Sequence, residues 1–141
     1  TGAPMNLDVP LLGLLRERMS WLHARQGVLS ENVANADSPG YVARDLKPID
    51  FESVLRDAAR AGGSGGHLTV TNSRHIALQG SGGGFQDMEA PDVEANPNGN
   101  TVSLEQEMIK VADTQAQYQA AANLYSKAIS LMRLAIGKPQ G

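Results

Sequence analysis

Residues 103–136 read SLEQEMIKVADTQAQYQAAANLYSKAISLMRLAI, and this stretch decides the fold class. It contains neither proline nor glycine, and its apolar side chains recur in alternating steps of four and three residues, a heptad pattern that only Gln115 interrupts. Ser103 followed by Gln106 resembles a capping box, and Gly137 supplies a stop. The pattern predicts one helix, about 50 Å long at about 1.5 Å per residue.

Two apolar stripes run along this predicted helix. The first stripe comprises Leu104, Met108, Val111, Tyr118, Ala122, Tyr125, Ile129, Met132 and Ile136. The second stripe lies beside it and comprises Ala121, Leu124, Ala128, Leu131 and Ala135. One partner helix covers one stripe, so two adjacent stripes favour contacts with more than one partner. A compact single-chain bundle that buries both stripes is the alternative that the pattern leaves open.

The N-terminal part of the chain carries the same heptad pattern between residues 8 and 36. One heptad position holds Leu12, Met19, Gln26 and Val33, and the other holds Leu15, Leu22, Leu29 and Ala36. Asp8 is the expected N-cap, and Pro10 is tolerated in a first turn. We therefore predict a mainly α fold in which residues 8–36 and 103–136 pair as a coiled-coil-like antiparallel hairpin, with Gln115 setting the register.

The N-terminal helix is expected to end in the stretch NVANADSPGY, residues 32–41. The consecutive proline and glycine favour a type II turn with a positive φ at the glycine. The two asparagines, one helical turn apart, can bond the last free carbonyls or the turn backbone, and plain helix termination is the alternative explanation. The turn motif comprises Asn32, Asn35, Ser38, Pro39, Gly40 and Tyr41.

The remaining sequence suggests three parts. Residues 1–4 look like a cloning remnant, and residues 5–61 hold the N-terminal helix, the turn and a short amphipathic helix that starts at Phe51. Residues 62–100 form a glycine-rich variable region, in which alternating apolar and polar side chains predict a small hairpin or irregular structure. Residues 101–141 contain the long C-terminal helix.

The composition narrows the function classes. A formal net charge of −3 and a pI of about 5.5 give no basic surface for nucleic acid or an anionic membrane. The absence of cysteine excludes disulfides, thiolate metal sites and a cysteine nucleophile. No apolar run of about 18 residues exists, and no basic segment with a following apolar region comes after Met5, so we expect neither a membrane span nor a cleavable signal peptide.

No pattern in the sequence points to catalysis or to a cofactor. Asp50 and Glu52 lie at a predicted helix start, where acidic side chains complement the helix dipole, and nothing nearby would separate their pKa values. The acidic segment 88–100 lacks the spacing of an EF-hand, and the three histidines lack paired ligand spacing. We therefore expect no enzyme activity, no metal, no cofactor and no small-molecule substrate.

These motifs resemble a known family. Residues 32–41 are similar to the N-terminal signature of bacterial flagellar rod, hook and hook-associated proteins, and residues 43–51, 71–76 and 98–108 resemble the flagellar basal-body rod proteins in particular. The resemblance covers residues 5–137. It implies a structural subunit whose terminal helices pack into the core of the periplasmic rod. It also implies export through the flagellar type III apparatus without a cleaved signal.

The resemblance implies three kinds of partner, namely other copies of the chain, other flagellar rod and basal-body proteins, and the export apparatus. The residues expected to form the packed stripes on the two helices are Leu15, Leu22, Leu29, Met108, Val111, Tyr118, Ala122, Tyr125, Ile129 and Met132. Neighbouring subunits are expected to contact Leu124, Ala128 and Leu131. A helical adaptor or export chaperone that binds a partner through the C-terminal helix is the alternative function.

Overall fold

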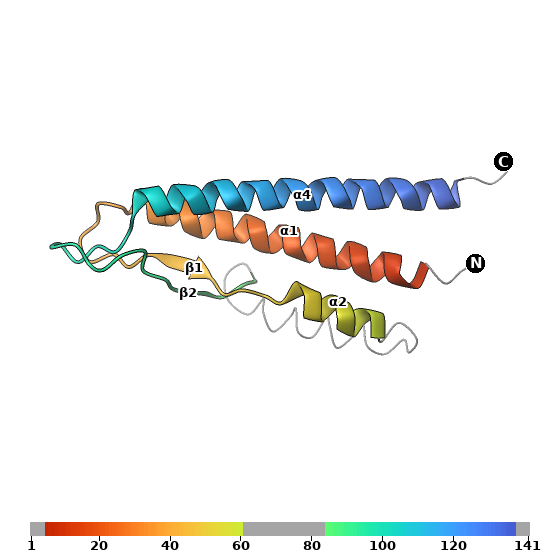
Figure 1. Cartoon of the computed structure of the whole chain (residues 1–141), viewed down its shortest axis with the longest axis horizontal. Helices are drawn as coiled ribbons and strands as arrows, with labels where there is room; N and C mark the ends of the chain where they lie inside the picture. Colours follow the sequence, from red (N-terminus) through yellow and green to blue (C-terminus); the bar gives the residue numbers. More distant parts are fainter. Residues whose placement is uncertain (1–4, 61–83, 138–141) are drawn as a thin grey trace.

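The computed structural model describes residues 5–60 and 84–137 (Figure 1). Its elements, in chain order, are α1 (Met5–Ala34), β1 (Arg44–Leu46), α2 (Phe51–Arg60), β2 (Asp87–Glu89) and α4 (Leu104–Ile136). The helices α1 and α4 lie side by side and run in opposite directions, so that both chain ends lie at one end of the molecule and the turns lie at the other. The predicted mainly α fold with two long paired terminal helices is confirmed.

Helix α4 begins and ends where the sequence predicts. The Ser103 side chain is the N-cap and accepts a hydrogen bond of 3.3 Å from the backbone N–H of Gln106. After the last helical residue, the N–H of Gly137 donates to the carbonyl of Arg133 at 2.6 Å. At both ends of α4, free backbone groups find their hydrogen-bond partners in residues three or four positions away in the chain. Local sequence was therefore sufficient to predict where the helix begins and ends.

Helix α1 begins earlier than expected. The helix starts at Met5, so the prediction that Asp8 caps its N-terminus was wrong, and the last residue is Ala34 rather than residue 36. Residues 5–7 contain no proline or glycine, and they continue the helix by most of a turn. Pro10 consequently lies inside the helix, where it provides no N–H for the carbonyl four residues before it.

The β structure joins two segments that lie far apart in the sequence. Strand β1 pairs with β2 in an antiparallel two-stranded sheet, with Arg44 opposite Glu89 and Leu46 opposite Asp87. Helix α2 matches the predicted short amphipathic helix and lies beside the N-terminal half of α1 (Figure 1). The alternating apolar and polar side chains that predict a small hairpin in the glycine-rich region fall at residues 67–78, which lie outside the described residues, as do residues 1–4.

The hydrophobic core lies between α1, the sheet and α4. It consists of Trp21, Leu22, Leu46, Phe85 and Ala121. The indole Nε1–H of Trp21 donates to the Lys47 carbonyl at 2.9 Å, and the Trp21 ring meets the Phe51 ring edge-on with the centroids 6.4 Å apart. A side chain of this size contributes roughly 1.5–3 kcal/mol when fully buried, so Trp21 ties α1 firmly to the segment between β1 and α2.

On α1, the row Leu15, Leu22 and Leu29 is buried, as the heptad pattern predicts. On α4, the residues that pack against α1 differ from the predicted first stripe. The buried positions are Glu107, Thr114 and Ala121, which follow one another at seven-residue steps. The helix is therefore rotated about its axis relative to the expected packing.

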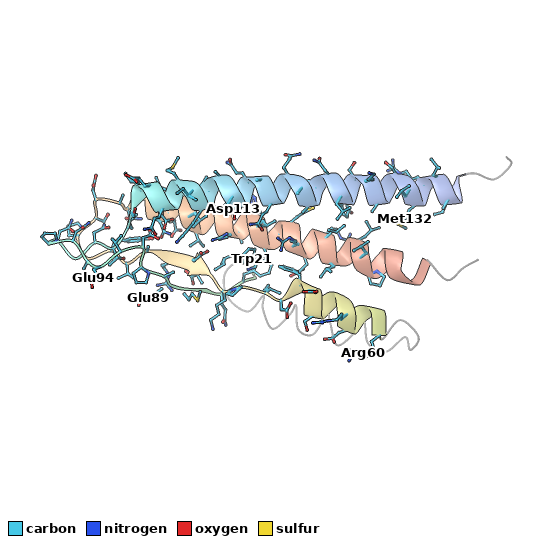
Figure 2. The ribbon with its side chains drawn as sticks, in the orientation of Figure 1. Trp21, Arg60, Glu89, Glu94, Asp113 and Met132 are labelled. Atoms are coloured by element: carbon cyan, nitrogen blue, oxygen red, sulfur yellow. The ribbon has the colours of Figure 1, made fainter. Side chains whose placement is uncertain are left out.

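This rotation corrects several predictions about α4. Leu104 and Met108 are 50% and 56% exposed, so the prediction that they are buried within the helix pair was wrong. Ala121, the first member of the second stripe, is buried inside this subunit. Val111, Ala122, Tyr125, Ile129 and Met132 of the first stripe are half-buried, whereas Tyr118 is exposed. Figure 2 shows Met132 on the side of α4 that faces α1.

Candidate functional site

The turn motif closes one end of the helix pair. The Tyr41 N–H donates to the Ser38 carbonyl at 3.3 Å, and Gly40 has a φ of 74°, which confirms the predicted type II turn. The Gly40 N–H donates to the carbonyl of Asn98 at 2.8 Å, so the loop before α4 sits directly on this turn. Gly99 has a φ of 84°, and a Cβ there would lie 3.2 Å from the Gly40 Cα. The two glycines allow this close approach.

Asn100 bonds the turn to the start of α4, and the sequence reasoning missed this residue. Its fully buried side chain donates from Nδ2 to the carbonyls of Asn35 at 2.9 Å and Ser38 at 2.7 Å. Its Oδ1 accepts from the Val102 N–H at 2.8 Å. Because one amide satisfies backbone groups from two distant segments, the loop before α4 has a defined position on the turn motif.

Asn32 connects the turn motif, β1 and α4. Its side chain is fully buried, and Nδ2 donates to the Arg44 carbonyl at 2.7 Å and to Oε1 of Glu107 at 2.9 Å. Oδ1 accepts from the Arg44 N–H and from the Tyr41 hydroxyl, both at 3.0 Å. The amide thus uses both donors and both acceptor positions. Of the two explanations that the sequence left open for Asn32, the structure supports specific contacts rather than plain helix termination.

Glu107 is a fully buried carboxylic group in the first turn of α4. One oxygen receives the Asn32 amide, while Oε2 has no hydrogen-bond donor among the described residues and lies 3.6 Å from the Lys110 ammonium. The nearby Asp92 carboxylate binds Lys110 at 2.9 Å and the Ser103 N–H at 3.0 Å. Burial, together with Asp92, raises the pKa of Glu107 to about 7. Burial alone would raise the pKa of Asp92, but hydrogen bonds with Glu107 and Lys110 lower it.

Polar pairs fix the register of α1 against α4. In one of these pairs, Arg25 of α1 donates to Thr114 of α4. Arg25 also donates from Nε and Nη2 to the two oxygens of Asp45, both at 2.9 Å. Sliding one helix along the other would leave these buried donors without acceptors. Gln115 is exposed, so the prediction that it sets the register was wrong. Among the described side chains, the pairs that cross the interface include Arg18 with Gln117 (2.7 Å), Arg25 with Thr114 (3.2 Å) and Asn32 with Glu107 (2.9 Å).

The C-terminal half of α4 presents uncovered apolar side chains. Among the described residues of α4, none beyond Ala121 is buried. Figure 1 shows the reason, because α1 and α4 lie close at the end with the turns and separate toward their termini. Of the predicted second stripe, Ala128 is half-buried and the two leucines are exposed. The large exposed apolar residues of this half are Leu124, Leu131, Leu134 and Ile136.

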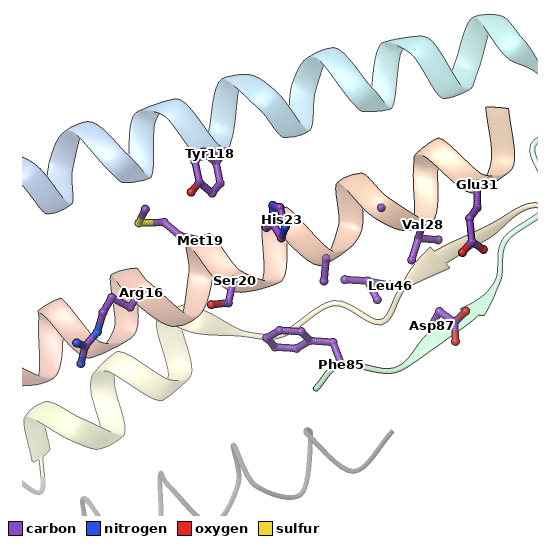
Figure 3. Close-up of a pocket in the computed structure, with 12 residues that line it drawn as sticks. Arg16, Met19, Ser20, His23, Val28, Glu31, Leu46, Phe85, Asp87 and Tyr118 are labelled. Atoms are coloured by element: carbon purple, nitrogen blue, oxygen red, sulfur yellow. The ribbon is translucent and has the colours of Figure 1, made fainter. Parts of the chain in front are cut away.

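A groove of about 1100 Å³ runs between α1 and the sheet (Figure 3). Its apolar wall includes Met19, Val28, Leu46 and Phe85, and Tyr118 extends toward it from α4.

Across residues 5–60 and 84–137, no group of three or more His, Asp or Glu could hold a metal ion. Within the same ranges, every helix is too short or too polar to cross a membrane.

The comparisons with known proteins extend over most of the chain. No family model matches it. It is 34% identical over 125 residues to the flagellar basal body rod protein FlgB of Proteus mirabilis, which covers 83% of this chain and 86% of the relative. It is 38% identical over 115 residues to FlgB of Yersinia ruckeri (74% and 77%) and 35% identical over 122 residues to FlgB of Escherichia coli (83% and 86%). The chain belongs to the FlgB family of flagellar basal body rod proteins.

Proposed function

We propose that this protein is a structural subunit of the flagellar basal-body rod and that it assembles through α1 and α4. The observation that carries the proposal is the uncovered apolar half of α4 (Leu124, Leu131, Leu134 and Ile136). Single exposed leucines are common on soluble proteins, but a run of them on one helix marks a contact surface. Completing the burial of four side chains that are already partly covered gains about 3–7 kcal/mol.

The placement of these side chains favours neighbours on two sides of each subunit. Successive helical residues are rotated by about 100°, so Leu124, Leu131 and Leu134 lie on one flank of the line that faces α1. Leu104, Met108 and Ile136 lie on the opposite flank. Two different apolar flanks permit head-to-tail contacts between copies, and such contacts build an open helical filament rather than a closed dimer. The proposed occupant of each flank is a helix of another copy or of a related rod protein.

The same proposal includes the route and the place of action. The named relatives are basal body rod proteins, which supports the periplasmic rod as the site of assembly and the flagellar export apparatus as the route. In this role the protein acts by packing, without catalysis, cofactor or small-molecule substrate. First-stripe residues that are half-buried in the subunit, such as Val111, Tyr125 and Met132, become fully covered on assembly.

The test replaces two exposed leucines with charge. A double variant Leu124→Glu and Leu131→Glu is introduced into a strain that lacks its own copy of the gene, and swimming and the rod content of purified basal bodies are measured. We expect both to be lost, because a carboxylate cannot be buried without a partner. Ser130→Glu, at an exposed position on another side of the same helix, is the matched control and should swim. Normal rods in the double variant would refute the proposal.

The adaptor or chaperone alternative makes a different prediction for the purified protein. A rod subunit should gain mass with concentration in light scattering, and the double variant should remain monomeric. A stable oligomer of fixed size, or a single tight partner at all concentrations, would favour the alternative. Circular dichroism of both proteins checks that the variant retains its helices.

A further inference from the structure

We propose that Glu107 and Asp92 share one proton inside the folded subunit, and that this proton makes the attachment of α4 to the turn motif sensitive to pH near neutrality. The proposal is independent of assembly, because every group involved belongs to one chain and both carboxylate side chains are covered within it. It concerns a conformational property of the subunit and assigns Glu107 a role beyond packing.

The geometry shows which of the two carboxylic groups keeps its charge. Both oxygens of Asp92 already accept from donors, one from Lys110 at 2.9 Å and the other from the Ser103 N–H at 3.0 Å. Glu107 receives only the neutral amide of Asn32, and its Oε2 faces Lys110 at 3.6 Å without a hydrogen bond. One ammonium cannot neutralise two buried carboxylates. A proton on Glu107 removes the excess charge and gives Glu107 a hydrogen bond with Asp92.

The surrounding charges do not supply a second cation for Glu107. Arg25 of α1 also interacts electrostatically with Glu107, but its guanidinium is bound to both oxygens of Asp45 in β1 and to the Thr114 hydroxyl. Glu107 lies in the first turn of α4, where the helix dipole favours a carboxylate, but burial beside the Asp92 carboxylate outweighs this effect and keeps the pKa of Glu107 raised. The titratable groups that act on this site are Arg25 from α1, Tyr41 from the turn motif, Asp45 from β1, Asp92 from the preceding loop, and Lys110 and Asp113 from α4.

The direction of the pH effect follows from proton affinities. The pKa of Glu107 rises from 4.5 to about 7 in the folded protein, which means that folding tightens proton binding about 300-fold. The native state therefore gains stability from this proton, fully at pH values below the unfolded pKa, and loses the gain as the pH rises through about 7. Asp92 affects stability in a separate pH range. Its lowered pKa stabilises the native state at neutral pH, and this contribution is lost only when the pH falls below the ordinary pKa of an aspartate.

A carboxyl titration of the full-length protein tests the proposal directly. In a ¹³C-labelled sample, one glutamate carboxyl resonance should titrate with a midpoint near 7, and Glu107→Gln should remove that resonance from the titration. Glu105→Gln is the matched control, because Glu105 is an exposed residue in the first turn of the same helix. If every glutamate carboxyl titrates below about pH 5, where free glutamate titrates, the proposal is wrong.

Urea unfolding measures the consequence for stability. Between pH 5.5 and pH 8.5, the unfolding constant of the wild type should increase about 30-fold more than that of Glu107→Gln, given a pKa shift of this size. All other titratable groups are present in both proteins, so their contributions cancel in the comparison. Equal pH dependence of the two proteins would overturn the proposal. Should the variant fail to fold, the wild-type titration decides alone.

Discussion

Replacing Asn32 with alanine tests whether the buried amide is the main connection between the two ends of the chain. The variant removes two donors and two acceptor positions that now serve Tyr41, Arg44 and Glu107. Among the described residues, no neighbouring side chain is placed to replace the four hydrogen bonds that Asn32 makes with Tyr41, Arg44 and Glu107. The fold itself should persist, because the core around Trp21 and Leu22 lies about three helical turns away along α1.

The size of the effect depends on which groups water can reach. Tyr41 is half-buried, so its hydroxyl can bond to water in the variant, whereas Glu107 is fully buried and the Arg44 backbone lies inside the sheet. Each buried polar group that loses its partner costs about 1–3 kcal/mol. The two backbone groups of the half-buried Arg44 take the lower value and the fully buried Glu107 takes the whole range, which gives roughly 3–5 kcal/mol in total. Alanine is the better helix former by about half a kcal/mol. We expect a net loss of about 3–4 kcal/mol.

Urea unfolding followed by circular dichroism at neutral pH measures this loss. Since domains of this size have a free energy of unfolding of about 5–15 kcal/mol, the variant should unfold at a much lower urea concentration. Asn123→Ala, at an exposed site on α4, is the control and should change stability by less than about half a kcal/mol. A loss below about 1 kcal/mol for Asn32→Ala would refute the view that this amide connects the turn, β1 and α4.

Two further substitution pairs test the turn and the ion pairs. Gly40→Ala should cost about 1 kcal/mol from its positive φ alone, and Gly99→Ala should cost more because its Cβ also meets the Gly40 backbone; equal losses in thermal unfolding would contradict this order. Arg25→Met should cost about 1–3 kcal/mol, with little dependence on salt, because it leaves the largely buried Asp45 without its cation. Arg44→Met, which breaks an exposed pair, should cost less than about 1 kcal/mol, and a larger loss there than at Arg25 would contradict the assignment.

Local sequence was sufficient wherever the physical cause was local. The bounds of α4 follow from a serine cap and a glycine stop, and the type II turn follows from consecutive proline and glycine. The buried row Leu15, Leu22 and Leu29 follows from heptad spacing, since residues seven apart lie on one face of a helix. In each case the cause is a property of residues close together in the chain.

The rotation of α4 was decided by tertiary contacts. Apolar side chains cover much of its circumference, so the heptad pattern identifies stripes but not which stripe meets α1. The structure selects the line Glu107, Thr114 and Ala121 because α1 presents polar partners to the first two. A search for apolar periodicity passes over glutamate and threonine, and for this reason the sequence reasoning missed the residues that fix the register.

By itself, the sequence determined two long helices, the turn that ends the first of them, and an excess of apolar surface on the second. Only the tertiary structure decided which part of that surface stays uncovered and where a proton is held. Asn32 and Glu107 are 75 residues apart in the chain, and no local pattern predicts that they meet. The properties of Glu107 arise from its burial beside Asp92, because the pKa of a carboxyl group depends on the charges and the solvent around it in the folded protein.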